Sequence, residues 1–248
     1  MDKLIYTAMT GAKHTLGQQA AVAHNLANAT TDAFRSEFSM LRAVPIRGEG
    51  MNTRAFVVDS SPGTDFSPGS IQTTGRPLDV AIIGRGWFAV RAPDGSEAYT
   101  RSGSFEIGIN GQLQTRAGHL VLGNSGGPIA IPPDVNIEFA SDGTISSIPT
   151  DNQPNQIAQV GVLKLVDPAD RNMERRADGL FRTRDATPQL ASAEVQITSG
   201  ALEGSNVNVV EQMVAMIALA RQFDIQMQML QNAERNDQNA AQLLATNG

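Results

Sequence analysis

A serine flanked by glycines is the residue of this sequence whose surroundings most resemble a catalytic motif. Residues 123–127 read Gly-Asn-Ser-Gly-Gly and fit the G-x-S-x-G pattern of serine nucleophiles. Such a serine needs a histidine base and an acid that orients it, and the histidines of this chain are His14, His24 and His119. The hydrolase motif joins a strand to a helix, whereas Pro128 and a β-like Ile-Ala-Ile segment follow it here. We therefore interpret Ser125 as part of a loop between strands, and a serine hydrolase stays only a remote alternative.

The sequence matches the patterns of a phosphate loop or a metal site even less well than that of a serine nucleophile. Gly84-Arg85-Gly86 is followed by Trp-Phe-Ala-Val, which is typical of a strand and offers no helix N-terminus to a phosphate. The histidines lack the i, i+4 spacing of a zinc site, and there is no cysteine to ligate a metal or act as nucleophile. We predict that the chain is not an enzyme and has no catalytic residue, metal or cofactor.

Composition excludes several kinds of partner. The net charge is -6 and the pI is about 5.1, with Lys and Arg scattered among acids, so we expect no nucleic-acid partner. The longest apolar run, residues 214–220, is far too short to span a bilayer, so we expect no direct membrane insertion. The opening residues lack the apolar run of a secretory signal, and any export is therefore expected to proceed without a cleaved signal peptide.

The middle of the chain has the pattern of a β domain. Short apolar or alternating runs begin near Asp79 and recur to Thr198, separated by turns rich in Gly, Pro and Asp. Asn110-Gly111 and Asp142-Gly143 are strong hairpin signals. These features predict a mainly antiparallel β domain over residues 76–190.

Both ends of the chain have helical periodicity instead. Apolar residues repeat at spacings of three and four near each terminus, and Asn206 or Asn208 is placed to cap the C-terminal helix. We predict an α+β fold in which long N- and C-terminal helices pair in a coiled-coil-like layer. The expected parts are an N-terminal helix (1–36), an extended connector (37–75), the β domain (76–190), a return connector (191–207) and a C-terminal helix (208–246). The two predicted seams are Ile5, Met9, Ala12, Leu16, Gln19, Ala23 and Leu26, and Met213, Met216, Ala220, Phe223, Met227 and Leu230.

Three segments resemble one known family, the flagellar basal-body rod and hook proteins. Residues 23–34 follow its N-terminal signature Ala-x-Asn-Leu-Ala-Asn-x-x-Thr-x-Gly-Phe, with Ala33 at the usual Gly. Residues 200–217 resemble its C-terminal signature, beginning Gly-Ala-Leu-Glu and continuing through Ser-Asn-Val. Residues 79–101 are similar to its β domain. The opening residues and Leu219–Phe223 are more similar to proximal-rod than to distal-rod members.

The resemblance implies a structural subunit of the proximal rod, polymerised through its terminal helices into part of a torque-transmitting drive shaft. Implied partners are copies of itself, neighbouring rod proteins and the flagellar type III export apparatus, in a rod that spans the periplasm. A distal-rod or hook-type paralogue is the alternative within the family, and a surface adhesin is a remote one outside it. The residues expected at subunit interfaces are Ile5, Met9, Leu16, Asn25, Leu26, Asn28, Phe34, Val210, Met213, Val214, Met216, Ile217, Phe223, Met227 and Leu230.

Overall fold

A computed structural model describes residues 2–45, 55–149 and 157–246. The chain divides into two compact units. The first unit holds Met1–Ala29, Ser36–Asp65 and Val207–Gly248, and the second holds Thr30–Arg35 and Phe66–Asn206. The described residues form two α-helices and several antiparallel sheets, so the α+β class is correct.

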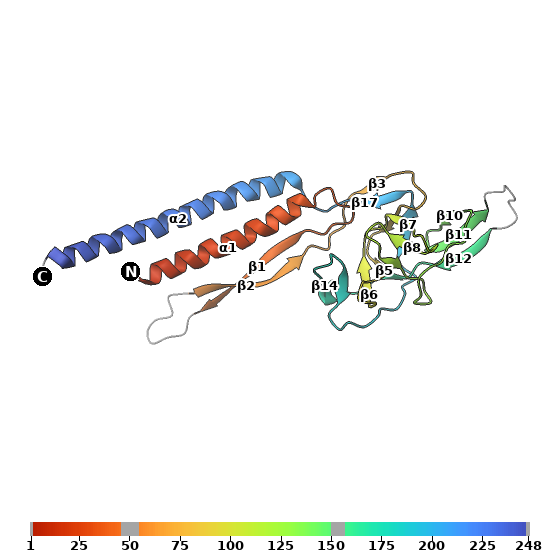
Figure 1. Cartoon of the computed structure of the whole chain (residues 1–248), viewed down its shortest axis with the longest axis horizontal. Coiled ribbons are helices and arrows are strands. Elements are labelled where there is room, and N and C mark those ends of the chain that lie inside the picture. Colours follow the sequence, from red (N-terminus) through yellow and green to blue (C-terminus); the bar gives the residue numbers. More distant parts are fainter. Residues whose placement is uncertain (1, 46–54, 150–156, 247–248) are drawn as a thin grey trace. The chain divides into compact units, whose positions relative to one another are not determined.

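The first unit combines both helices with one β-hairpin. Helix α1 (Asp2–Ala27) and helix α2 (Val209–Thr246) lie side by side and run antiparallel, as Figure 1 shows. Strands β1 (Glu37–Pro45) and β2 (Ala55–Thr64) pair antiparallel and contact α1. The Oδ1 atom of Asn208 accepts from the amides of Val210 and Glu211 at 3.1 and 3.3 Å. Asn208 therefore caps α2, one of the two caps that the sequence predicts.

The predicted coiled-coil-like layer of paired helices is wrong. The first unit contains a β-hairpin in addition to the two helices, and the second unit contains a large antiparallel sheet. The predicted knobs Met9, Leu16 and Met213 are 53%, 51% and 51% exposed. Among residues 8–27 of α1 the buried positions are the small or polar residues Ala8, Ala12, Thr15 and Asn25, of which Ala12 alone belongs to the predicted seam.

Close approach of the two backbones explains this outcome. The Thr15 hydroxyl donates to Gln226 Oε1 of α2 at 3.2 Å, and a Cβ added to Gly11 would lie 3.1 Å from Gln226 Nε2. Small side chains permit such an approach, whereas coiled-coil packing needs large apolar knobs on the facing sides. The helices therefore meet along a line of small and polar groups, and many of their largest apolar side chains stay exposed.

The second unit is built from short strands. Its sheets contain β3 (Ile71–Thr73), β4 (Val80–Ile83), β5 (Trp87–Arg91), β6 (Glu97–Thr100), β7 (Phe105–Ile107), β8 (Leu113–Thr115), β9 (Leu120–Val121), β10 (Val135–Phe139), β11 (Thr144–Pro149), β12 (Ala158–Val162), β13 (Leu165–Val166), β14 (Met173–Arg175), β15 (Phe181–Thr183), β16 (Gln196–Ser199) and β17 (Ala201–Glu203). A 3₁₀ turn covers Asp170–Asn172.

Strand pairing in this unit is antiparallel throughout the described residues. The largest sheet has the order β14-β15-β6-β5-β9-β8-β7, with β13 also on β5. Smaller sheets are β10-β11-β12, β16-β4 and β17-β3. Both predicted hairpins are confirmed, because Asn110-Gly111 joins β7 to β8 and Asp142-Gly143 joins β10 to β11.

Two apolar clusters form the core of this unit. The larger contains Phe88, Phe105 and Leu113, all fully buried. The smaller surrounds Trp87, which is 4% exposed and whose ring lies 4.7 Å from that of Phe181, between centroids. The single tryptophan therefore serves as a core anchor of the β unit.

Ala33 stands where the N-terminal signature has Gly, and its backbone is in a left-handed conformation. Its φ is +59°, in the left-handed region, and its amide donates to the Glu203 carbonyl at 2.7 Å. An L-residue in that region is disfavoured by about 1 kcal/mol relative to Gly. Ala33 therefore holds a left-handed turn at some conformational cost, and this turn bonds to strand β17.

Candidate functional site

An apolar surface covers the first half of α2. Val210, Met213, Val214 and Ile217 follow i, i+3, i+4, i+7 spacing, which places them on one side of the helix. Their exposed fractions are 70%, 51%, 62% and 57%. We call these four residues the α2 patch. Desolvating such side chains is favourable, at about 25 cal/mol for each Å² of apolar surface buried.

The α2 patch ends where the same side of the helix becomes polar. At about 100° per residue, Gln228 lies within about 20° of Ile217 around the axis, and it is exposed. Arg221 and Asp224 are also exposed between them. The α2 patch therefore covers the first turns of α2, next to the Asn208 cap, and polar residues separate it from the exposed apolar residues farther along, Ile225, Met227 and Met229.

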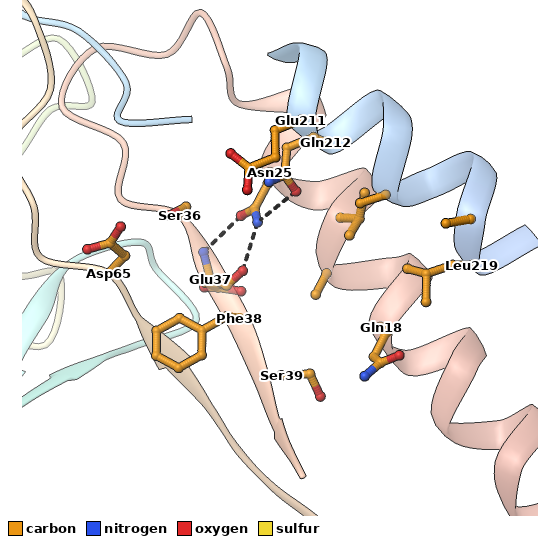
Figure 2. Close-up of a pocket in the computed structure, with 14 residues that line it drawn as sticks. Gln18, Asn25, Ser36, Glu37, Phe38, Ser39, Asp65, Glu211, Gln212 and Leu219 are labelled. Carbon is orange, nitrogen blue, oxygen red and sulfur yellow. Dashed lines mark hydrogen bonds between the residues drawn. The ribbon is translucent and has the colours of Figure 1, made fainter. Parts of the chain in front are cut away.

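A groove of about 530 Å³ lies between α1, α2 and the start of β1 (Figure 2). Its apolar lining includes Val22, Phe38 and Leu219, and Glu37, Asp65 and Glu211 supply carboxylates. Phe38 itself is 48% exposed. We call it the terminal groove, since every element that lines it belongs to the first unit.

Asn25 lines the terminal groove and is hydrogen-bonded to the elements around it. Its Nδ2 donates to the Glu37 carbonyl at 2.7 Å and to Gln212 Oε1 at 3.4 Å, while its Oδ1 accepts from the Glu37 amide at 2.8 Å (Figure 2). The side chain thus links α1 to β1 and α2. This signature asparagine, predicted at a subunit interface, makes these bonds inside its own unit.

The other predicted interface residues lie in different surroundings. Met227 is 38% exposed. Leu26, Asn28, Met216, Phe223 and Leu230 are half-buried. Phe34 is buried in the second unit, with the Arg175 guanidinium 4.6 Å from its ring centroid. Ile5 lies on α1, but its side chain is outside the described part. Their role at subunit interfaces stays a prediction.

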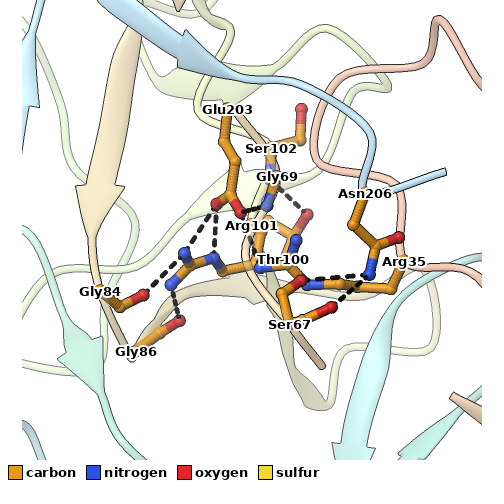
Figure 3. A network of polar contacts seen from close by, with 10 residues as sticks. All are labelled: Arg35, Ser67, Gly69, Gly84, Gly86, Thr100, Arg101, Ser102, Glu203 and Asn206. Carbon is orange, nitrogen blue, oxygen red and sulfur yellow. Dashed lines mark hydrogen bonds and ion pairs between the residues drawn. The ribbon is translucent and has the colours of Figure 1, made fainter. Parts of the chain in front are cut away.

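A buried ionic cluster in the second unit was missed by the sequence analysis. Glu203 accepts from Arg101 through Oε2, at 2.7 Å from both Nε and Nη2, and from Arg35 Nη2 through Oε1 at 2.8 Å (Figure 3). The Gly69 amide also donates to Oε1 at 2.9 Å. All three charged side chains are at most 2% exposed. We call Arg35, Arg101 and Glu203 the buried cluster.

The buried cluster joins the two separate stretches of chain that make up this unit, Thr30–Arg35 and Phe66–Asn206. Arg35 follows α1 in sequence, and Glu203 precedes α2. The Asn206 amide donates to the Phe34 carbonyl at 3.3 Å, so the two segments also bond directly. Glu203 alternates with Ala201, both buried on strand β17. A glutamate at an inward-facing strand position was the one sequence signal for this cluster.

The serine motif occupies a tight turn. The Gly123 amide donates to the Gly127 carbonyl at 2.9 Å, and the Gly126 amide donates to the Gly123 carbonyl at 2.8 Å. Leu122 and Pro128 form a bridge across this turn, so a bridged turn follows Ser125 where the hydrolase motif needs a helix.

Within residues 2–45, 55–149 and 157–246, no group of three or more His, Asp or Glu side chains is arranged to hold a metal ion. Neither helix in the part of the chain that the structure describes is long and apolar enough to cross a bilayer.

Comparison with known proteins gives full-length matches. The family models for the flagellar hook protein FlgE/F/G D1 domain and the flagellar basal body rod FlgEFG protein C-terminal match residues 81–147 and 198–243. Flagellar basal-body rod protein FlgF of Salmonella typhimurium strain LT2 is 47% identical over 99% of both chains, and that of Escherichia coli K12 is equally so. The rod protein FlgG of Buchnera aphidicola (subsp. Schizaphis graminum) is 32% identical over 90% of this chain and 92% of its own.

Proposed function

We propose a mode of assembly for this chain from the premise that it belongs to the flagellar basal-body rod protein family, and within it to FlgF. It is a structural subunit of the rod in the flagellar basal body, and it is not an enzyme. The proposal is that it polymerises through α1 and α2, with copies of itself and with neighbouring rod proteins. The product is part of the proximal rod, a drive shaft that crosses the periplasm.

The observation that carries this proposal is the exposure of the α2 patch. Four large apolar side chains lie together on a helix that contacts α1 along the same stretch, where Gln212 bonds to Asn25. An exposed apolar group of this kind, rimmed by polar residues, is typical of a protein interaction site. Met9 and Leu16 of α1 are similarly half exposed, so both terminal helices offer apolar surface to neighbours.

The contacts are proposed to be heterologous. A patch that binds a different surface of the next copy generates an open helical assembly, whereas a self-complementary patch closes into a dimer. The terminal groove, with its mixed apolar and acidic lining, is a different surface of the same unit. The α2 patch and the terminal groove thus supply two unlike surfaces for head-to-tail contact.

Export fits the same account. We propose that the flagellar type III apparatus exports the chain without a cleaved signal peptide, with the terminal segments in 1–36 and 208–246 incompletely folded until neighbours cover them. Segments that fold on binding pay their ordering entropy at that step. In this scheme the β domain in 76–190 is the part that is stable alone.

Hydrogen exchange of the purified full-length monomer tests this scheme. We expect amides of α1 and α2 to exchange rapidly at micromolar concentration, while amides of β4, β5 and β6 are strongly protected. The reason is that the strands pack on a buried core, whereas each helix covers only one flank of the other. Equal, strong protection of helices and strands in the monomer would contradict folding on assembly.

A further inference from the structure

Arg35 is buried, and only one of its three guanidinium nitrogens has a hydrogen-bond acceptor among the described residues. Its Nη2 pairs with Glu203, but neither Nε nor Nη1 has an acceptor among the described residues. These two nitrogens carry three N–H groups. The side chain is 2% exposed, and burying charged donors without an acceptor is unfavourable. The position therefore calls for an acceptor that the described residues do not supply.

Arg101 provides a direct comparison within the same cluster. Its Nε and Nη2 pair with Glu203, its Nη1 donates to the Gly86 carbonyl at 2.7 Å, and its Nη2 also donates to the Gly84 carbonyl at 2.9 Å (Figure 3). Every nitrogen of that guanidinium has an acceptor. Within the buried cluster, the deficit of acceptors is thus specific to Arg35.

A cavity of about 140 Å³ is lined by both arginines. Its other walls come from the 84–86 loop, Trp87, Phe66, Pro68, Asp167 and Asp170. A water molecule takes up about 30 Å³ of liquid volume. The cavity thus has room for an ion of roughly five non-hydrogen atoms beside Arg35.

The charge of the surroundings favours an anion at the inner end of the cavity. The buried cluster holds two guanidinium groups and one carboxylate, so its net charge is positive. Asp167 and Asp170 are 33% and 50% exposed, and both lie near Arg85, at 3.5 and 3.7 Å. Solvent screens these outer charges more than the buried ones. An uncompensated buried charge is strongly disfavoured, and an anion beside Arg35 would compensate it.

We propose that this cavity is a binding site for a small oxyanion, inorganic phosphate or a free carboxylate, held by the N–H groups of Arg35. Charge-assisted hydrogen bonds from guanidinium to such oxygens are among the stronger ones in proteins. The bound anion completes the cluster that joins the short stretch of this unit, at Arg35, to its long stretch, at Glu203. Anion binding therefore stabilises the second unit at the point where these two stretches meet.

Thermal unfolding of the full-length protein tests the site. Inorganic phosphate is titrated at constant ionic strength, with chloride as the balancing anion. We expect a saturable rise in the Tm of the β unit, by about 3 to 6 °C at ten times the dissociation constant. Acetate in a parallel titration shows whether a simple carboxylate also binds, and equilibrium dialysis with labelled phosphate gives the number of ions bound.

Three variants separate this site from general salt effects. Arg35→Lys keeps a cation for Glu203 but removes the unpaired N–H groups, so it is expected to abolish the phosphate-dependent rise while keeping a Tm near wild type without phosphate. Arg116→Lys, at an exposed position outside the cavity, is the matched control and keeps the rise. Asp167→Asn removes a repelling carboxylate and is expected to tighten phosphate binding roughly three- to ten-fold.

Two results would contradict the oxyanion site. Phosphate stabilises proteins generally by exclusion from their surface, and that effect does not depend on Arg35. If wild type and Arg35→Lys gain the same Tm from phosphate, or if dialysis finds no bound phosphate in wild type, the cavity is not an oxyanion site.

Discussion

Replacing Ile217 by Asp is expected to reduce incorporation into the basal body on the order of 100-fold, and with it motility. The proposed contact would place an unpaired carboxylate in an apolar interface, a penalty of several kcal/mol, and every 1.4 kcal/mol is tenfold in affinity. Ile217 is 57% exposed within the chain, so the free energy of unfolding of the monomer should change by no more than about 0.5 kcal/mol. Incorporation is measured by quantifying the variant in isolated basal bodies.

Gln228→Asp is the matched control for this experiment. Gln228 lies on the same side of α2 and is exposed, but it is outside the α2 patch. It receives the same new charge on the same helix, so near-normal incorporation is expected. Normal incorporation of Ile217→Asp, or equal loss in both variants, would show that the α2 patch does not carry assembly.

Replacing Glu203 by Ala is expected to lower the free energy of unfolding of the second unit by about 3–5 kcal/mol. The change leaves Arg35 and Arg101 buried without their shared carboxylate, and removal of one partner from a buried ionic group typically costs that much. Burial already lowers the pKa of the Arg101 guanidinium, and Glu203 acts in the opposite direction. The loss is a large share of the roughly 5–15 kcal/mol that stabilises a domain. Urea unfolding measures it.

Two further variants establish that charge, and not shape, is the cause. Glu203→Gln keeps the size of the side chain and an acceptor for the Gly69 amide, yet it should still lose about half of the effect. Asp170→Asn breaks only the exposed pair with Arg85 and should change stability by less than about 1 kcal/mol. A loss below about 1 kcal/mol for Glu203→Ala would mean that the buried cluster is not a stabilising element.

Local sequence signals predicted the β unit well, because its strands are joined by tight turns. Asn110-Gly111 and Asp142-Gly143 each fix a hairpin by backbone conformation within two residues. The β1–β2 hairpin lacks such a signal. Residues 45–76 are rich in Gly and Pro, and the sequence predicted an extended connector over 37–75, whereas residues 37–45 pair with residues 55–64.

The helix faces show that periodicity alone does not determine which apolar residues meet the neighbouring helix. Heptad spacing selected the largest apolar residues as the facing line, such as Leu16 and Met213, yet these stay half exposed. The real contact uses Thr15 and Gln226, whose hydrogen bond needs close backbones. A repeat of apolar residues therefore does not reveal whether its own chain or a neighbouring chain covers that side.

The buried cluster joins residues that are far apart along the chain, at positions 35, 101 and 203. No local pattern connects them, and the sequence of the 84–86 loop indicates only that it is not a phosphate loop. That loop presents the carbonyls of Gly84 and Gly86 to Arg101. Only tertiary structure brings its backbone and the two stretches of this unit to one place.

Photo-crosslinking in native basal bodies tests the assembly mode most directly. A benzophenone amino acid replaces Val214 in the α2 patch or, as the control, Gln228. Illumination is predicted to join position 214 to another copy of this chain or to a neighbouring rod protein, identified by mass spectrometry, with few adducts from position 228. Absence of adducts at position 214 in assembled basal bodies, or equal yields at both positions, would contradict assembly through the terminal helices.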